Sequence, residues 1–418
     1  MTNSSDSIRS YRARWVVPVD GPPIDGGVVC VRGDRIHSIG TPDACAAGVF
    51  EDLGDVLLLP GLVNAHTHLE LGGLRGRITS RNLWDWFDEL VKLNRSPDAE
   101  IERRRAVLDG AAESIAGGAT TIGDISRTGA SAELLVQSPI RKVCYLELIS
   151  GARTLPNDAV TLCKQFDSLR RAITQDDRLR LGISPHAPYS VTRSDLCAAI
   201  ELATEHNAPL TMHFLETADE ARWLHEGGGR VADYLSRYQV RRGESTPPGD
   251  VLKHLESCGA LGRKMLLAHV NYVDDATIAR LAASRCSVVW CPRTHSYFGH
   301  PPHRWRELLA AGVNVCLGTD SLASTPTLSM LDEMRYIQTC FPDSEPATIL
   351  AMATRHGAEA LAMSHAVGTL SPGKRADIIA VRWSSNGPQD PLRNLLHGTG
   401  DLVKVWIGGE NVHCSPSS

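Results

Sequence analysis

The sequence lacks three features that mark specialised classes of protein. No apolar run approaches the roughly 18 residues that a membrane-spanning helix needs. The opening stretch MTNSSDSIRSYRARWVV lacks the basic segment and apolar core of a secretory signal. No Cys-x-x-Cys pair occurs among the 11 cysteines, most of which lie in apolar strings such as VVC and KVCYL. We therefore expect a cytoplasmic protein with buried thiols, without a disulfide framework or a zinc knuckle.

An excess of charge of one sign is also lacking. The 418 residues include 43 Lys and Arg against 48 Asp and Glu, which gives a net charge of −5. This balance provides no electrostatic attraction for nucleic acid or for an anionic membrane surface. Because 42% of the residues are hydrophobic, the chain can bury a large core, and we expect a globular protein.

The two ends of the chain alternate short β-rich strings with turn residues. The strings RARWVVPV and VVCVRGDRIHSIG near the start resemble GTLSPGKRADIIAVRW and LVKVWIGGENV near the end in this pattern. Alternation of apolar strings and turns is typical of hairpins rather than helices. The sequence therefore predicts one small β-sandwich domain that residues 1–57 and 366–418 form together.

The middle of the chain, residues 58–365, alternates apolar strings with amphipathic helical segments. The strings include ATTIGD, KVCYLELI, RLRLGISPH, APLTMHF, KMLLAHV, CSVVWCP and GVNVCLGTD. Such alternation over this length predicts a parallel (β/α)8 barrel, and a doubly wound open sheet is the alternative. No Gly-x-Gly-x-x-Gly turn opens a helix after the first strand, so a dinucleotide-binding fold is disfavoured.

Histidines and carboxylates occur where these strings end, which is the side of a barrel that carries active sites. The first pair follows the apolar run DVLLLPGL, which is expected to form the first barrel strand. The set consists of His66, His68, His186, His213, Glu216, His269 and Asp320. Because residues i and i+2 of a strand point to one side, His66 and His68 can face the same ion. Nitrogen ligands with one carboxylate suit Zn²⁺, or Fe²⁺, with a position left for water.

This ordered set resembles the amidohydrolase superfamily, whose members carry HxH on strand one, His on strands five and six, and Asp on strand eight. The phrases PGLVNAHTHLE and GTLSPGKRADIIAV match its opening and closing segments. Within it, SPHAPYS, MHFLET, LAHV and LGTDS resemble the subgroup of cyclic-amidine deaminases and triazine chlorohydrolases. The resemblance implies the (β/α)8 barrel with a small β-sandwich and, as in many members, a homodimer.

The resemblance also implies a role for each residue of the set. His66, His68, His213 and Asp320 would bind one divalent metal ion, most commonly Zn²⁺. Glu216 would shuttle a proton, while His269 and Asp320 would orient the attacking water. The strand-four lysine of binuclear members has no counterpart in RLRLGISPH, so one metal ion is expected.

The expected reaction is hydrolytic deamination of a cyclic amidine, with a 6-aminopurine nucleoside such as aminodeoxyfutalosine as the substrate. The alternatives are a chlorohydrolase or aminohydrolase of triazine-like rings, hydrolysis of an amide, and a scaffold without activity. Three residues are candidates for substrate binding: His186, Trp86, which can stack on a purine, and Arg293, which can pair with an anionic group. His295, His300 and His303 lie among prolines. They could line the mouth of the pocket or bind a metal ion, but we expect solvated loop residues.

Overall fold

The computed structural model describes residues 7–45, 50–152, 155–173, 178–238, 249–250 and 252–414. By the density of its internal contacts the chain forms two compact units. Unit 1 comprises the described residues up to Asn64, Ala112–Ile122 and the described residues from Ser329 onward. Unit 2 comprises the described residues of Ala65–Ala111 and Gly123–Leu328. In the described part of the chain, no helix is both long enough and apolar enough to cross a membrane.

Unit 1 contains two sheets built from strands near both ends of the chain. One sheet has the order β5-β4-β1-β6 and the other β18-β17-β16-β7-β2-β3. The strands are β1 Ile8–Arg12, β2 Trp15–Val16, β3 Ile24–Asp25, β4 Val28–Arg32, β5 Arg35–Gly40, β6 Glu51–Asp52, β7 Val56–Pro60, β16 Ile378–Arg382, β17 Leu402–Ile407 and β18 Glu410–Cys414. Alternate residues of both sheets, among them Tyr11, Val31, Leu58, Ile378 and Trp406, form one apolar core.

The third sheet is a parallel (β/α)8 barrel, as predicted. Its strands follow one another around the sheet in chain order. They are β8 Leu62–Thr67, β9 Ala119–Ser126, β10 Arg141–Leu148, β11 Leu179–Pro185, β12 Leu210–Phe214, β13 Met265–His269, β14 Ser287–Trp290 and β15 Asn314–Leu317. A parallel bridge between Thr67 and Asp320 joins the first strand to the segment after the last. This bridge nearly closes the barrel.

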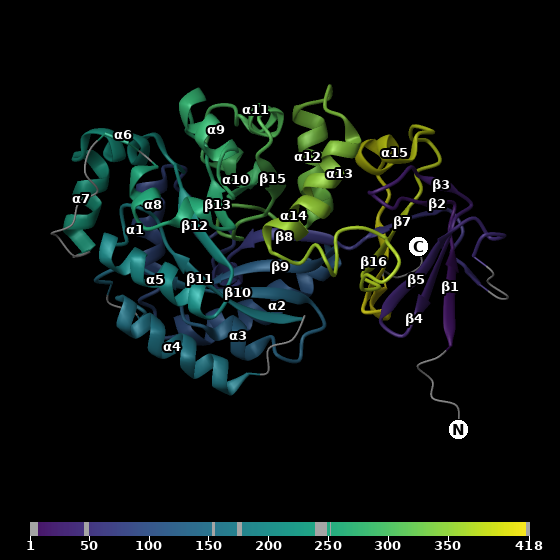
Figure 1. Ribbon diagram of the computed structural model, residues 1–418, viewed down its shortest axis with the longest axis horizontal. Helices are drawn as coiled ribbons and strands as arrows, with labels where there is room; N and C mark the ends of the chain where they lie inside the picture. Colours follow the sequence, from purple (N-terminus) through teal and green to yellow (C-terminus); the bar gives the residue numbers. More distant parts are fainter. Residues whose placement is uncertain are drawn as a thin grey trace. The chain divides into compact units, whose positions relative to one another are not determined.

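Helices connect the barrel strands, and in Figure 1 α4, α5 and α9 lie outside them. The helices are α1 Leu83–Leu93, α2 Ala99–Ala116, α3 Ala130–Leu134, α4 Ala159–Ala172, α5 Arg193–Glu205, α6 Ala218–Glu226, α7 Gly229–Tyr238, α8 Lys253–Ser257, α9 Asp275–Ala282, α10 Pro292–Tyr297, α11 Trp305–Ala310, α12 Met330–Cys340, α13 Pro346–Met352, α14 Arg355–Ala360 and α15 Pro391–His397. Two 3-10 segments also occur among the described residues: η2 Leu69–Leu74, with six residues, and η3 Ala260–Gly262, with three.

Local sequence sets where these helices begin. Asp158, Thr192 and Asp274 precede α4, α5 and α9, and the side chain of each accepts a hydrogen bond from a backbone N–H of the first turn. Such caps satisfy N–H groups that have no partner within the helix. In the barrel itself, Gly182 of β11 is required, because a Cβ there would lie 2.4 Å from the Tyr145 ring of β10.

Two expectations from the sequence are wrong. The run DVLLLPGL does not form the first barrel strand: Val56–Pro60 is β7 of unit 1, and the barrel begins with Leu62–Thr67, which contains His66. Both strands are fully buried, so their apolar strings merge in the sequence. The chain also contains a disulfide, since α5 and the end of α8 bring Cys197 to Cys258. Six of the nine free cysteines, among them Cys30 and Cys144, are buried thiols, as expected.

Candidate active site

Three histidines converge at the ends of the barrel strands. His66 lies in β8, His68 follows that strand, and His213 lies in β12. The ring centroid of His66 is 4.9 Å from that of His68 and 5.0 Å from that of His213. One ring nitrogen from each lies within 4.8 Å of the others. The alternation of side chains along a strand therefore directs His66 and His68 to one point, as the sequence predicts.

The donors of this cluster fit a divalent cation. His66 is 1% exposed, yet neither ring nitrogen has a hydrogen-bond partner among the described residues. His213 Nδ1 donates to the carbonyl of His186 at 3.0 Å, which leaves the lone pair of Nε2 free to face His68 Nε2 at 3.2 Å. A proton on His68 Nε2 makes this contact a hydrogen bond, and when both nitrogens are unprotonated their lone pairs can bind one cation.

The protonation of the cluster agrees with that fit. Burial lowers the pKa of His213 to about 4, and burial also lowers the pKa of His66 and His68 well below the ordinary value. The positive charges that the rings would place on one another lower the pKa of His66 further. At neutral pH the three rings are therefore neutral, which is the form that binds metal.

Asp320 joins the cluster from the segment after β15. Its Oδ1 lies 3.7 Å from His68 Nε2, and its backbone N–H donates to the carbonyl of His66 at 3.0 Å. The close approach of the two segments requires Gly318, because a Cβ there would lie 2.8 Å from His66 O. Burial raises the pKa of Asp320 to about 7, and the Ser324 hydroxyl donates to its Oδ2 at 3.4 Å.

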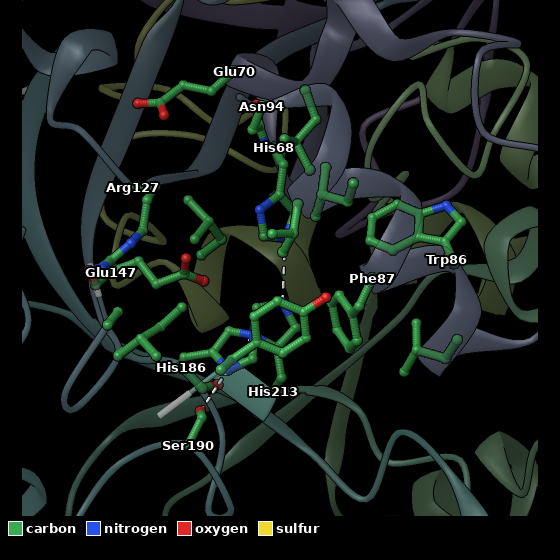
Figure 2. A pocket seen from close by; sticks show the side chains of 18 of the residues that line it. His68, Glu70, Trp86, Phe87, Asn94, Arg127, Glu147, His186, Ser190 and His213 are labelled. Atoms are coloured by element: carbon green, nitrogen blue, oxygen red, sulfur yellow. Dashed lines mark hydrogen bonds between the residues drawn. The ribbon is translucent and has the colours of Figure 1, made fainter. Parts of the chain in front are cut away.

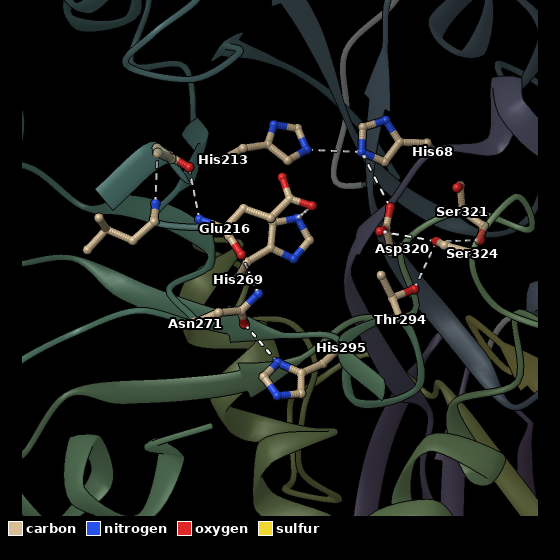
Figure 3. Close-up of polar contacts among 12 residues, drawn as sticks. His68, His213, Glu216, His269, Asn271, Thr294, His295, Asp320, Ser321 and Ser324 are labelled. Carbon is tan, nitrogen blue, oxygen red and sulfur yellow. Dashed lines mark hydrogen bonds and ion pairs between the residues drawn. The ribbon is translucent and has the colours of Figure 1, made fainter. Parts of the chain in front are cut away.

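Glu216 and His269 face each other beside the cluster (Figure 3). His269 Nε2 lies 3.6 Å from Glu216 Oε1, and both residues are buried. Burial raises the pKa of Glu216 well above its ordinary range, and the nearby charges of Asp320 and Glu220 raise it further. Glu216 is therefore a carboxylic acid that can hold a proton at neutral pH and release it to a bound molecule.

The backbone around Glu216 is held by groups that sequence reasoning missed. Glu220 accepts hydrogen bonds from the N–H groups of Leu215, at 3.0 Å, and Glu216, at 2.9 Å. The side-chain amide of Asn271 donates to the carbonyl of Glu216 at 3.0 Å. Glu220 could have been predicted from the sequence, because it is a carboxylate four residues after Glu216 and lies in the first turn of a helix.

The short helix α10 reaches the site through two side chains. Thr294 hydrogen-bonds to the Ser324 hydroxyl at 3.0 Å, and Ser324 contacts Asp320. His295 Nδ1 lies 3.0 Å from Asn271 Oδ1, and its Nε2 lies 2.8 Å from Pro301 O (Figure 3). One helix turn therefore supports both Asp320 and Glu216.

The expectation of solvated loop histidines is wrong for His295 and His303. Both are buried, and His303 Nε2 donates to the carbonyl of His269 at 2.8 Å. The ring of His303 stacks on that of Trp290, with centroids 5.1 Å apart. The prolines around these histidines indicated a surface loop, but the segment folds back over β14 and so becomes part of the wall behind the site.

A cavity of about 550 Å³ opens onto the cluster. His186 and Trp86 line it, together with Phe87, Tyr189 and Tyr234 (Figure 2). The indole N–H of Trp86 donates to Ala323 O at 3.2 Å, so its polar edge is already used. Ser190 Oγ lies 2.6 Å from His186 Nδ1 and orients that ring.

Arg293 is absent from the described residues that line this cavity. Its guanidinium donates to the side chain and the carbonyl of Thr327, at 2.9 and 2.8 Å. A residue that does line the cavity, and that sequence reasoning missed, is Glu147 at the end of β10. The sequence pattern that identified the other site residues, a polar side chain where a buried strand ends, also applies to Glu147.

Comparisons with known proteins agree with this geometry. The chain is 31% identical over 421 residues to a 5-methylthioadenosine/S-adenosylhomocysteine deaminase of Moorella thermoacetica, covering 94% of this chain and 91% of that protein. It is 27% identical over 348 residues to an aminodeoxyfutalosine deaminase of Deinococcus radiodurans, covering 81% of each.

The fold is shared with the crystal structure of a Xanthomonas campestris adenosine deaminase with bound zinc. The TM-score is 0.82 at 24% identity, and the match covers 96% of this chain and 92% of that one. The profile described as "Amidohydrolase family" matches residues 57–412. By its strand-end residues and by this match, the chain belongs to the amidohydrolase family.

Proposed function

We propose that this protein is a hydrolytic deaminase of 6-aminopurine nucleosides that uses one zinc ion. The observation that carries the proposal is the buried carboxyl of Glu216, which lies 3.6 Å from His269 and beside the three histidines, where burial raises its pKa. The deaminase names of the relatives from Moorella thermoacetica and Deinococcus radiodurans support the substrate class. Aminodeoxyfutalosine is the candidate that the sequence favours.

The zinc ion would be held by His66, His68, His213 and Asp320, where it supplies hydroxide from water near neutral pH. The chain's own groups handle the protons. The Asp320 carboxylate can accept a proton from the attacking water. Glu216 can donate its proton to the ring nitrogen next to the reacting carbon, which makes that carbon more electrophilic.

The reaction balances as the addition of water and the loss of ammonia. A C–O bond forms at the amidine carbon as Asp320 takes one proton of the water and Glu216 gives its proton to the ring nitrogen. The proton on Asp320 then passes to the exocyclic amine, the C–N bond breaks to release ammonia, and the remaining hydroxyl proton returns to Glu216 as the carbonyl forms. His269, 3.6 Å from Glu216 and pinned by His303, keeps the water oriented from the other side. The aromatic wall of Trp86 and Phe87 excludes bulk water and offers a face for the purine.

The first experiment measures ammonia release by the zinc-loaded protein from a panel of substrates. The panel comprises aminodeoxyfutalosine, adenosine, methylthioadenosine, S-adenosylhomocysteine, guanine, cytosine and a chlorotriazine. We expect ammonia from at least one 6-aminopurine nucleoside. Chloride from the triazine, with no ammonia from any purine, would contradict the proposed substrate class.

Replacing the proton donor tests the mechanism. Glu216→Gln should lower kcat by about 10²- to 10⁴-fold, because the amide has no proton to transfer. Its zinc content, measured by atomic emission, should equal that of the wild type. Glu226→Gln, an exposed carboxylate at the end of α6, is the matched control and should keep full activity. Full activity in Glu216→Gln would refute the role of Glu216.

A further inference from the structure

Glu147 is a buried carboxylate that the proposed mechanism does not use. It lies at the end of β10 and is 7% exposed, and it lines the cavity. Its Oε1 has no hydrogen-bond partner among the described residues. In Figure 2 its carboxylate points from the wall toward the space above His186 and His213. A buried carboxylate oxygen without a partner is costly, so the position indicates a group that pairs with a ligand.

The spacing between Glu147 and His186 leaves room for one ligand atom. A carboxylate oxygen of Glu147, a ring nitrogen of His186 and a ring nitrogen of His213 all lie within 4.8 Å of one another. No direct hydrogen bond joins the side chains of Glu147 and His186 in the described residues. An oxygen atom about 2.8 Å from each of them would span that distance with normal hydrogen-bond geometry. Because Ser190 engages Nδ1 of His186, Nε2 remains available to such an atom.

The charges around Glu147 favour a group that both donates and accepts. Burial raises the pKa of Glu147 to about 7, although the charge of Arg127 opposes this shift. Arg127 itself is occupied, since its guanidinium donates to the carbonyls of Glu147 and Pro156. Near neutral pH the carboxyl therefore occurs both ionised, as an acceptor, and protonated, as a donor. A hydroxyl group can pair with either form, whereas an ammonium only donates.

Glu147 also lies on the opposite side of the cavity from the aromatic wall. Figure 2 places Glu147 and Arg127 on one side and Phe87 and Trp86 on the other. A cavity of about 550 Å³ holds more than a heterocyclic base alone. A nucleoside can therefore place its base near Glu216 and its sugar beside Glu147.

We propose that Glu147, together with His186, forms a subsite that binds a hydroxyl group of the substrate's sugar. The inference rests on the proposed function, because it takes a nucleoside as the substrate. The subsite selects ribose over deoxyribose substrates and makes Glu147 a specificity-determining residue.

The test compares kcat/KM for adenosine, 2′-deoxyadenosine and 3′-deoxyadenosine in the zinc-loaded wild type and in Glu147→Leu. The wild type should prefer adenosine by about 10- to 100-fold over the deoxy substrate that lacks the bound hydroxyl. In Glu147→Leu the kcat/KM values for adenosine and for that deoxy substrate should be nearly equal. Whether the wild type discriminates against 2′-deoxyadenosine or 3′-deoxyadenosine shows which hydroxyl is bound. Glu201→Gln, an exposed carboxylate on α5, should keep the wild-type preference.

A binding measurement keeps the inference testable apart from the reaction. The dissociation constants of inosine and 2′,3′-dideoxyinosine can be measured without turnover. The wild type should bind inosine more tightly than the dideoxy compound, and Glu147→Leu should lose this difference. If inosine binds with that preference but no purine releases ammonia, the proposed reaction fails and the subsite stands. The subsite would be overturned if Glu147→Leu kept the wild-type preference or if the protein bound no nucleoside at all. It would also be overturned if Glu147→Leu lost a metal ion, because Glu147, His186 and His213 would then be the ligands of that ion.

Discussion

At the scale of single residues, several residues of the site have positive φ values, a backbone conformation that non-glycine residues rarely adopt. His269 and Asp320 have φ values of 73° and 61°, and Leu215 and Val270 have φ values of 50° and 53°. Non-glycine residues in this left-handed region carry strain of about 1–3 kcal/mol each. Backbone hydrogen bonds hold them there: Val270 N–H donates to Phe214 O at 2.9 Å, and Asp320 N–H donates to His66 O at 3.0 Å. The reacting groups are therefore fixed before a substrate binds.

Asp124 of β9 should make stability depend on pH. Burial raises its pKa to about 8, and its Oδ1 accepts from Leu69 N–H at 2.8 Å. Between pH 4 and 8 the folded chain keeps a proton that the unfolded chain loses, so stability falls as the pH rises. Asp124→Asn retains the acceptor but has no proton to lose.

We therefore expect the free energy of unfolding of Asp124→Asn, relative to that of the wild type, to rise by about 3 kcal/mol between pH 5 and pH 8. Urea unfolding of both proteins at these two pH values measures this difference. A difference in stability that stays constant with pH would show that Asp124 ionises normally in the folded protein.

At the scale of elements, short segments after the strands do more than connect them. Helix α10 has one turn and a half, yet it supports Asp320 through Thr294 and Ser324, and Glu216 through His295 and Asn271. Hydrogen-bonded partners behind reactive groups set orientation with little tolerance. The segment is therefore a positioning element rather than a loop.

His295→Ala should lower kcat/KM by about 10- to 100-fold with unchanged metal content, because Asn271 loses its partner. The pH at which activity changes should also move, since the surroundings of Glu216 relax. His295→Asn, which can still donate toward Asn271, should restore most of the activity. The control is His300→Ala, whose ring pairs with Tyr272 instead. A pH profile identical to the wild type in His295→Ala would assign His295 a structural role alone.

The sequence predicts these elements unevenly, for physical reasons. Strands such as GVNVCLGTD, followed at once by a lone polar residue, reveal both the strand and its reactive end. DVLLLPGL is misassigned because two consecutive buried strands of different sheets leave no polar boundary between them. His303 is missed because burial by a folded-back loop depends on contacts far apart in the chain. The direction of the Arg293 side chain depends on the orientation of α10, which cannot be predicted from the periodicity of the sequence.

At the scale of the whole molecule, the proposed metal ligands come from distant parts of unit 2. His66, His213 and Asp320 come from the first, fifth and eighth strands of the barrel or the segments after them. A cation that binds them binds only the folded chain, and so it stabilises the fold by mass action. The barrel is otherwise closed at this end by the bridge of Thr67 and Asp320.

Removal of the metal with a chelator should therefore lower the midpoint of thermal unfolding. Free zinc at about 1,000 times its dissociation constant contributes about 4 kcal/mol, which corresponds to roughly 5 °C for a chain of this size. Differential scanning calorimetry with and without zinc measures the shift, and added zinc should reverse it. His66→Ala should show no response to zinc. An equal response in that variant would place the stabilising ion elsewhere.

The cavity has two ends of different construction, and this has a consequence for evolution. Residues on left-handed backbone form the end of the cavity that is proposed to carry hydrolysis, while Glu147 and side chains of α1 and α7 line the rest of it. The side chains of α1 and α7 come from segments other than those that carry His66, His213 and Asp320. A lineage can therefore acquire a new substrate by exchanging a few side chains of these two helices, without ever passing through an ancestor that has lost its chemistry.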